Sequence, residues 1–237
     1  MAELFKWKQM QQVLKDPSLL FFNRAARATK LYKAGEFEPA CEAYALAQNE
    51  MERMVHSRPT GETIATFFFN YARSSQSMGG AFCQSIRLFS QVLDASPKHE
   101  RALDARAVCH NALGDFESAL ADLAELQTKF KTSAETATVR SWAQRVAEIK
   151  AEQRKAAHDV LGVERDADEA EVKKVYRKLC LNWHPDKHAS STEDQRERAR
   201  HRFARIQAAY EKMHASGRSS SGFDGFGGYD FPGRRGR

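Results

Sequence analysis

The sequence lacks the features of membrane-spanning and β-rich proteins. No run of about 18 apolar residues occurs, so no membrane-spanning helix is expected. Only 6 of the 237 residues are proline, and no alternating β-branched pattern or Asn-Gly hairpin separates apolar runs. Apolar residues instead recur at helical spacing. The sequence therefore predicts an all-α protein.

Cysteine pairs and a strong charge imbalance are also missing. The four cysteines (Cys41, Cys83, Cys109 and Cys180) are scattered and form no C-x-x-C pair, which argues against a zinc site or a disulfide framework. Residues 1–10 lack the apolar core of a secretory signal. We therefore expect a reducing compartment, cytoplasmic or also nuclear. The net charge of +6 weakly favours acidic partners.

Three stretches of the N-terminal half share one pattern. A glycine is followed by an aromatic residue two places on, a small residue five places on and a larger apolar residue nine places on. The stretches are Gly35 with Phe37, Ala40 and Tyr44; Gly80 with Phe82, Ser85 and Phe89; and Gly114 with Phe116, Ala119 and Leu123. The pattern resembles the tetratricopeptide repeat, because the spacing from Gly80 to Gly114 matches the period of that repeat, about 34 residues.

The first repeat is longer than the others. Gly35 and Gly80 are farther apart than one such period, so an insertion of about 11 residues is expected. Part of it should lie in a loop over residues 57–61. An alanine lies seven places before Gly35 and before Gly114, but in the middle repeat it lies seven places before Gly79. We therefore predict one extra turn residue there.

The composition divides the chain into five segments. Residues 1–19 are predicted to be an N-terminal helical segment, residues 20–131 three degenerate repeats, and residues 132–156 a capping and linker helix that begins at the capping box Thr132-x-x-Glu135. Residues 150–157 are polar on every side and predict a helical arm that crosses solvent. Residues 157–215 form a second compact unit. Residues 216–237 are rich in Gly and Phe and are expected to be disordered.

The second unit is predicted to be a helical hairpin. Asp168 can cap a helix that ends near Asn182, with an apolar face of Val172, Val175, Tyr176 and Leu179. A second helix starts near Glu193, and a short helix near residues 157–161 precedes both. The turn between the long helices contains His184-Pro185-Asp186. This tripeptide, the upstream Tyr176-Arg177-Lys178-Leu179 and the closing Phe203-x-x-Ile206-x-x-Ala209-Tyr210 together resemble the J domain of DnaJ-type co-chaperones.

The resemblance implies a function. J domains bind heat-shock-70 chaperones and stimulate their ATP hydrolysis. Carried over to this sequence, the chaperone-binding residues are the tripeptide His184, Pro185 and Asp186 and the upstream residues Lys173, Lys174, Tyr176, Arg177 and Lys178. The chain itself is expected to be no enzyme and to need no cofactor or metal, because no nucleophile accompanies His184 and Asp186. Cys180, His184 and His188 have helical ligand spacing, but Pro185 interrupts that helix.

Repeats, a helical linker and a C-terminal J domain together resemble the tetratricopeptide repeat protein 2 type of co-chaperone, which bridges heat-shock-70 and heat-shock-90 machinery. Asn70 and Arg101 match groove residues that clamp a chaperone's acidic tail. Ala25, Thr29 and Ala105 stand where other clamp residues are needed. The groove is therefore predicted to bind a partner chaperone or a client polypeptide.

Two other functions stay open. The chain could be a repeat adaptor whose J-like unit is inactive. It could also be a ribosome- or RNA-associated factor, because arginines recur over residues 196–202 and 234–237. Interleaved acidic residues and the short tail argue against nucleic acid as a partner.

Overall fold

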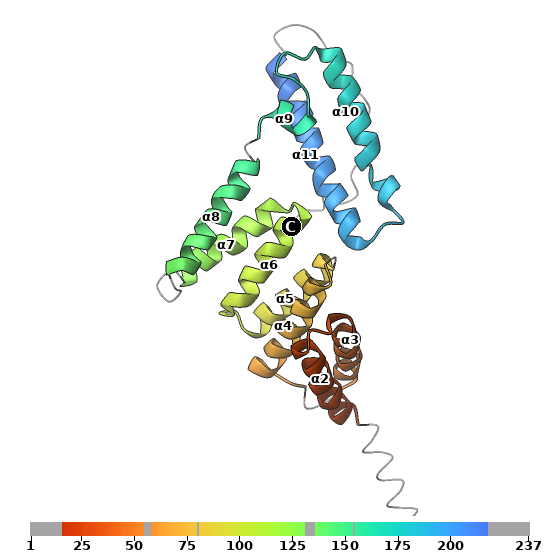
Figure 1. Ribbon diagram of the computed structural model, residues 1–237, viewed down its shortest axis with the longest axis vertical. Coiled ribbons are helices and arrows are strands. Elements are labelled where there is room, and N and C mark those ends of the chain that lie inside the picture. Colours follow the sequence, from red (N-terminus) through yellow and green to blue (C-terminus); the bar gives the residue numbers. More distant parts are fainter. Residues whose placement is uncertain (1–15, 55–57, 80, 131–135, 154, 218–237) are drawn as a thin grey trace, which may run out of the picture.

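The computed structural model describes residues 16–54, 58–79, 81–130, 136–153 and 155–217. Within these ranges every regular element is a helix, as predicted, and no strand occurs (Figure 1). The predicted N-terminal segment lies outside the described residues apart from its last residues. The predicted disordered tail lies outside them from residue 218 on; its first two residues, Ser216 and Gly217, instead belong to a helix that ends at Gly217. None of the helices in the described part of the chain is long and apolar enough to cross a membrane.

Six helices form three consecutive antiparallel hairpins. The first pairs α2 (Pro17–Lys33) with α3 (Phe37–Arg53), the second α4 (Gly61–Ser77) with α5 (Phe82–Ala95), and the third α6 (Glu100–Leu113) with α7 (Phe116–Phe130). Each hairpin packs on the next, which makes the repeat array that the sequence predicts. The first helix begins at Pro17, with Asp16 as its N-cap.

The small residues of the repeat pattern lie where the paired helices approach each other. All six are at most 2% exposed, and the larger residues nine places after each glycine, Tyr44, Phe89 and Leu123, are at most 1% exposed. The six small residues are Ala28 and Ala40, Ala72 and Ser85, and Ala107 and Ala119. A larger side chain at any of these positions would push two helices apart.

The turn glycines confirm the extra residue in the second repeat. Gly35, Gly79 and Gly114 have φ of 80°, 75° and 81°, a conformation that strains any residue with a Cβ. Gly79 is therefore the structural equivalent of the other two. The insertion in the first repeat is spread over helices as well as a loop: α3 and α4 have 17 residues each, against 14 in α5 and α6.

Helix α8 (Thr136–Gln153) covers the end of the array. Trp142 and Ile149 on its apolar stripe are 1% and 4% exposed and pack with residues of the third hairpin. The predicted capping box at residues 132–135 lies outside the described residues.

The predicted solvent-crossing arm is wrong. Helix α8 ends at Gln153, and Ala156 is extended, with φ −62° and ψ 152°. The polar end of α8 is held by the C-terminal unit, because Arg205 donates to the backbone oxygen of Glu152 at 3.2 Å and to its carboxylate at 3.1 Å. The C-terminal unit thus lies beside the array rather than at the end of a free helix.

The C-terminal unit is the predicted hairpin. It contains α9 (Ala157–Leu161), α10 (Glu169–Trp183), the 3₁₀ turn η1 (Pro185–His188) and α11 (Glu193–Gly217). Helices α10 and α11 run antiparallel, and α9 packs across α11 (Figure 1). Four residues at most 5% exposed make its core: Leu161, Val172, Ile206 and Ala209.

Candidate functional site

Helix α10 is oriented by its N-cap and its apolar stripe. The carboxylate of Asp168 accepts the backbone N–H of Glu171 at 2.7 Å, which starts the helix. Val172 is 5% exposed, and Leu179 packs against the core of the C-terminal unit. The opposite side of α10 therefore faces solvent.

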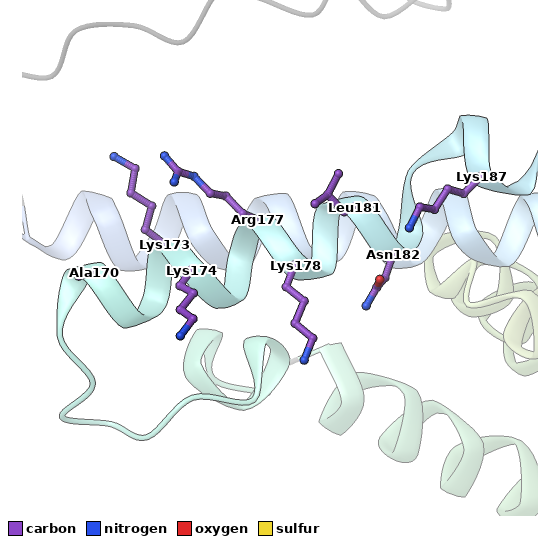
Figure 2. Close-up of a pocket in the computed structure, with 8 residues that line it drawn as sticks. All are labelled: Ala170, Lys173, Lys174, Arg177, Lys178, Leu181, Asn182 and Lys187. Carbon is purple, nitrogen blue, oxygen red and sulfur yellow. The ribbon is translucent and has the colours of Figure 1, made fainter.

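That solvent side carries the predicted cations. Lys173 and Arg177 project to one side of the helix in line with Leu181, and Lys174 and Lys178 project to the other side in line with Asn182 (Figure 2). These residues, together with Ala170 and Lys187 of η1, line one open surface groove, which we call the basic groove.

The cations of the basic groove are not neutralised within the chain. In the part of the chain that the structure describes, no carboxylate forms an ion pair with Lys173, Lys174, Arg177, Lys178 or Lys187. Unpaired cations on one exposed face create a positive potential that attracts an acidic partner.

The His184-Pro185-Asp186 turn lies at the C-terminal end of the basic groove. Helix α10 stops at Trp183 because the residue before a proline disfavours helical geometry, and His184 has ψ of 135°. Pro185 starts η1, and the Nδ1 atom of His184 accepts the backbone N–H of Asp186 at 3.3 Å. The Asp186 carboxylate is 90% exposed.

Aromatic contacts hold the turn against α11. The ring of His184 meets Phe203 edge to face, with centroids 6.0 Å apart. His188 stacks on Trp183 at 5.9 Å and lies 3.1 Å from the backbone oxygen of Asn182. The guanidinium of Arg202 lies 5.9 Å from the centre of the Trp183 ring. These contacts connect the turn to both α10 and α11.

The structure separates Tyr176 from the other predicted chaperone-binding residues. Its half-buried ring stacks on Tyr210, and burial raises the pKa of its hydroxyl. The sequence reasoning missed two residues of the basic groove, Leu181 and Lys187. The side chain of Leu181 is 63% exposed between the cations. Leu181 could have been noticed as an apolar residue off the buried stripe of α10.

The three suggested metal ligands serve other contacts. Burial raises the pKa of the Cys180 thiol, while His184 and His188 contact aromatic rings. Among the described residues, no three or more His, Cys, Asp or Glu side chains are grouped so that they could hold a metal ion.

In the predicted groove of the repeats, Asn70 is half-buried on α4, and Arg101 is exposed on α6. Burial raises the pKa of the Tyr44 hydroxyl, and hydrogen bonds with Thr29 and Asn70 oppose that effect. Thr29 lies 3.1 Å from this hydroxyl. Asn70 therefore already has a partner within the array, whereas Arg101 points to solvent.

Comparisons with known proteins agree with this architecture. Residues 156–218 match the DnaJ domain family. The chain is 28% identical over 196 residues to the DnaJ homolog subfamily C member 7 homolog of Schizosaccharomyces pombe. The aligned region covers 79% of this chain and 37% of that protein. It is 32% identical over 130 residues to the human DnaJ homolog subfamily C member 3, covering 55% of this chain and 25% of that protein.

Among solved structures, the TPR2B domain of yeast Sti1 in complex with an Hsp70 peptide is similar in fold, with a TM-score of 0.44 and 18% identity. The matched region covers 57% of this chain and 99% of the Sti1 domain chain. At that score, the similarity fixes neither a shared ligand nor a shared function.

The chain is thus a helical-repeat protein that carries a DnaJ domain. Its relatives are DnaJ subfamily C proteins, and the chain spans between 25% and 37% of the length of the two relatives named above. The narrower resemblance to the tetratricopeptide repeat protein 2 type stays a prediction.

Proposed function

We propose that this protein is a co-chaperone that binds a heat-shock-70 chaperone through its DnaJ domain and stimulates ATP hydrolysis by that chaperone. The observation that carries the proposal is the basic groove, whose unpaired cations lie beside the fixed His184-Pro185-Asp186 turn. The chain itself is proposed to have no enzymatic activity, and we propose that it acts in the cytoplasm or also the nucleus.

The residue types suit this role. Clustered lysine and arginine side chains steer an acidic surface and orient it on contact. The Asp186 carboxylate, 90% exposed, is free to make a charge-assisted hydrogen bond to an arginine of the partner. Because the turn is already ordered, binding costs little conformational entropy.

We further propose that the groove of the repeat array recruits a client polypeptide or a second chaperone, such as a heat-shock-90 protein. Arg101 is exposed and could meet an acidic tail. Ala105 is 7% exposed and offers no charge where a clamp needs one. A pull-down of the full chain with and without a competing chaperone-tail peptide separates tail binding from client binding.

Single-turnover ATP hydrolysis by a heat-shock-70 chaperone tests the main proposal. We expect His184→Gln to abolish most of the stimulation, while the matched control His99→Gln, in the repeat array, retains it. Lys174→Gln/Lys178→Gln should weaken stimulation, and Lys30→Gln/Lys33→Gln, which changes the net charge equally, should not. Equal stimulation by wild type and His184→Gln would reject the mechanism. No stimulation by wild type would favour the adaptor alternative.

The nucleic-acid alternative loses support on α11, because its arginines contact the chain itself. Arg196 donates to the backbone oxygens of Ala189 and Ser191, each at 3.2 Å. Arg200 pairs with Glu197. Arg202 contacts Trp183, as described above. The arginines at residues 234–237 lie outside the described residues.

A further inference from the structure

Helix α5 has no N-cap of its own. Its N-cap position is Ala81, which has no side-chain oxygen, and its first turn contains no acidic residue. The backbone N–H groups of Phe82 and Cys83 instead donate to the carboxylate of Asp194, at 2.6 and 2.8 Å. Asp194 lies on α11 and is 4% exposed. A residue of the DnaJ domain therefore caps a helix of the repeat array.

The neighbours of Asp194 strengthen this contact. Arg87 of α5 makes two hydrogen bonds to the Glu193 carboxylate, at 2.6 and 3.0 Å. Arg198 of α11 lies 5.4 Å from the centre of the Phe82 ring. The first two turns of α11 thus meet the start of α5 through a buried cap, an ion pair and a cation–π contact. We call this set of contacts the latch.

Helix α11 meets the array at a second place, farther along the helix. Arg205 lies 5.0 Å from the centre of the Phe116 ring at the start of α7 and also binds Glu152. His201 lies next to Gly114, and a Cβ at that glycine would lie 3.7 Å from it. Two separated contacts on one helix fix its direction as well as its position.

The latch also bounds the chaperone-binding loop. That loop starts at His184, where α10 ends, and continues to Thr192, directly before Glu193. Both ends of the loop are held within the DnaJ domain, the second by Arg196, which donates to Ala189 and Ser191, and this second end directly adjoins the latch on the repeat array. The contacts of the latch involve none of the basic-groove cations.

We propose that Asp194 latches the DnaJ domain to the repeat array and is a positioning residue for the chaperone-binding loop. The second half of this proposal rests on the proposed function. Removing the carboxylate leaves two backbone N–H groups at the start of α5 without their acceptor. The DnaJ domain then loses its anchor on the array directly beyond the loop, so holding the loop in its binding orientation costs more conformational entropy.

Cys83 reports on the latch directly. Burial and a hydrogen bond to Asp194 raise the pKa of its thiol to about 12. A thiol with so high a pKa reacts slowly with an alkylating reagent, because the thiolate is the nucleophile. The rate at which N-ethylmaleimide labels Cys83 in the full chain, resolved from the other cysteines by peptide mass spectrometry, measures latch opening.

We expect Asp194→Ala to raise the labelling rate of Cys83 at least about tenfold. Asp194→Asn keeps the shape and one acceptor oxygen, so its rate should be intermediate. Asp16→Ala removes the exposed cap of α2 (Asp16 accepts from Ser18 at 2.8 Å) and should leave the rate unchanged. Cys109, 0% exposed, should stay unlabelled throughout, which shows that the array remains folded. An unchanged Cys83 rate in Asp194→Ala with Cys109 protected overturns the latch.

The positioning role has its own readout. At limiting concentration, Asp194→Ala should stimulate chaperone ATP hydrolysis about three- to tenfold less than wild type, and Asp16→Ala should match wild type. Faster Cys83 labelling with full stimulation overturns the positioning role but keeps the latch. If wild type does not stimulate, the proposed function and the positioning role both fail, while labelling still decides the latch.

Discussion

The ring of Tyr176 on α10 lies flat on the ring of Tyr210 on α11, with centroids 3.9 Å apart and planes 9° from parallel. Burial raises the pKa of both hydroxyls. Tyr176 lies between Lys174 and Arg177 in sequence. Its stack therefore sets the rotation of α10 that turns the basic groove towards solvent.

Removing one ring should destabilise the DnaJ domain. We expect Tyr210→Ala to lower the free energy of unfolding by about 3 kcal/mol, because it loses a large packed ring and leaves a cavity. Tyr210→Phe keeps the stacked ring and should lie within about 1 kcal/mol of wild type. Urea unfolding followed by circular dichroism measures both, and equal losses in the two variants would contradict a role for the stack.

Leu181 should contribute to binding but not to stability. Its side chain is 63% exposed beside the cations of the basic groove. We expect Leu181→Ala to weaken binding to a heat-shock-70 chaperone without changing the melting temperature, because the mutation exposes nothing that was buried. Its effect should persist at high salt, since burial of apolar area is not screened.

Lys178→Ala provides the contrast. The lysine acts through charge, so its effect on binding should shrink as added salt shortens the Debye length from about 10 Å at 0.1 M towards about 3 Å at 1 M. Titrations of both variants over a salt series measure the difference. The same salt dependence for both variants would mean that Leu181 makes no apolar contact with the partner.

Arg106 ties together three helices of the array. Its guanidinium donates to both carboxylate oxygens of Asp122 on α7, at 2.9 and 2.7 Å, and to Ser90 on α5 at 3.0 Å. The Asp122 side chain is 7% exposed. Asp122→Ala should lower the free energy of unfolding by about 3 kcal/mol, because it leaves a largely buried cation unpaired.

Replacing both members of this pair tests whether the loss comes from the unpaired charge. Arg106→Met/Asp122→Leu removes both charges and should recover most of the stability of wild type in denaturant unfolding. A double variant as unstable as Asp122→Ala would instead assign the loss to packing around the two side chains.

The sequence predicted those parts of the fold that depend on neighbours in the chain. Ala28, Ala72 and Ala107 were found from their spacing to a turn glycine, and all three are buried. The shift from Gly80 to Gly79 followed from the same spacing, because a hairpin repeats its small residues at a fixed distance from its turn.

Contacts between segments that are far apart in the sequence are not marked by any regular residue spacing. Asp194 is 112 positions from Phe82 along the chain, and an acidic residue in the first turn of a helix is ordinary for its own helix dipole. The predicted arm failed for the same reason, since the partner of Glu152 is Arg205, 53 positions farther along the chain. The absence of a capping side chain at Ala81 does not single out the docking, because Ala156 at the start of α9 lacks one too.

The ion pair of the latch should make stability depend on pH. The hydrogen bond from Arg87 lowers the pKa of Glu193 below 4.5, its ordinary value, although partial burial opposes the shift. A carboxyl whose pKa is lower in the folded state contributes stability above its unfolded pKa and loses that contribution as the pH falls through its folded pKa. Wild type should therefore melt at a higher temperature than Glu193→Gln above about pH 5, and the difference should close as the pH falls below about 4.

Glu211→Gln, on the same helix but without an ion pair among the described residues, should match wild type across the range. A difference between wild type and Glu193→Gln that grows on acidification would show that the carboxylate destabilises the docked arrangement.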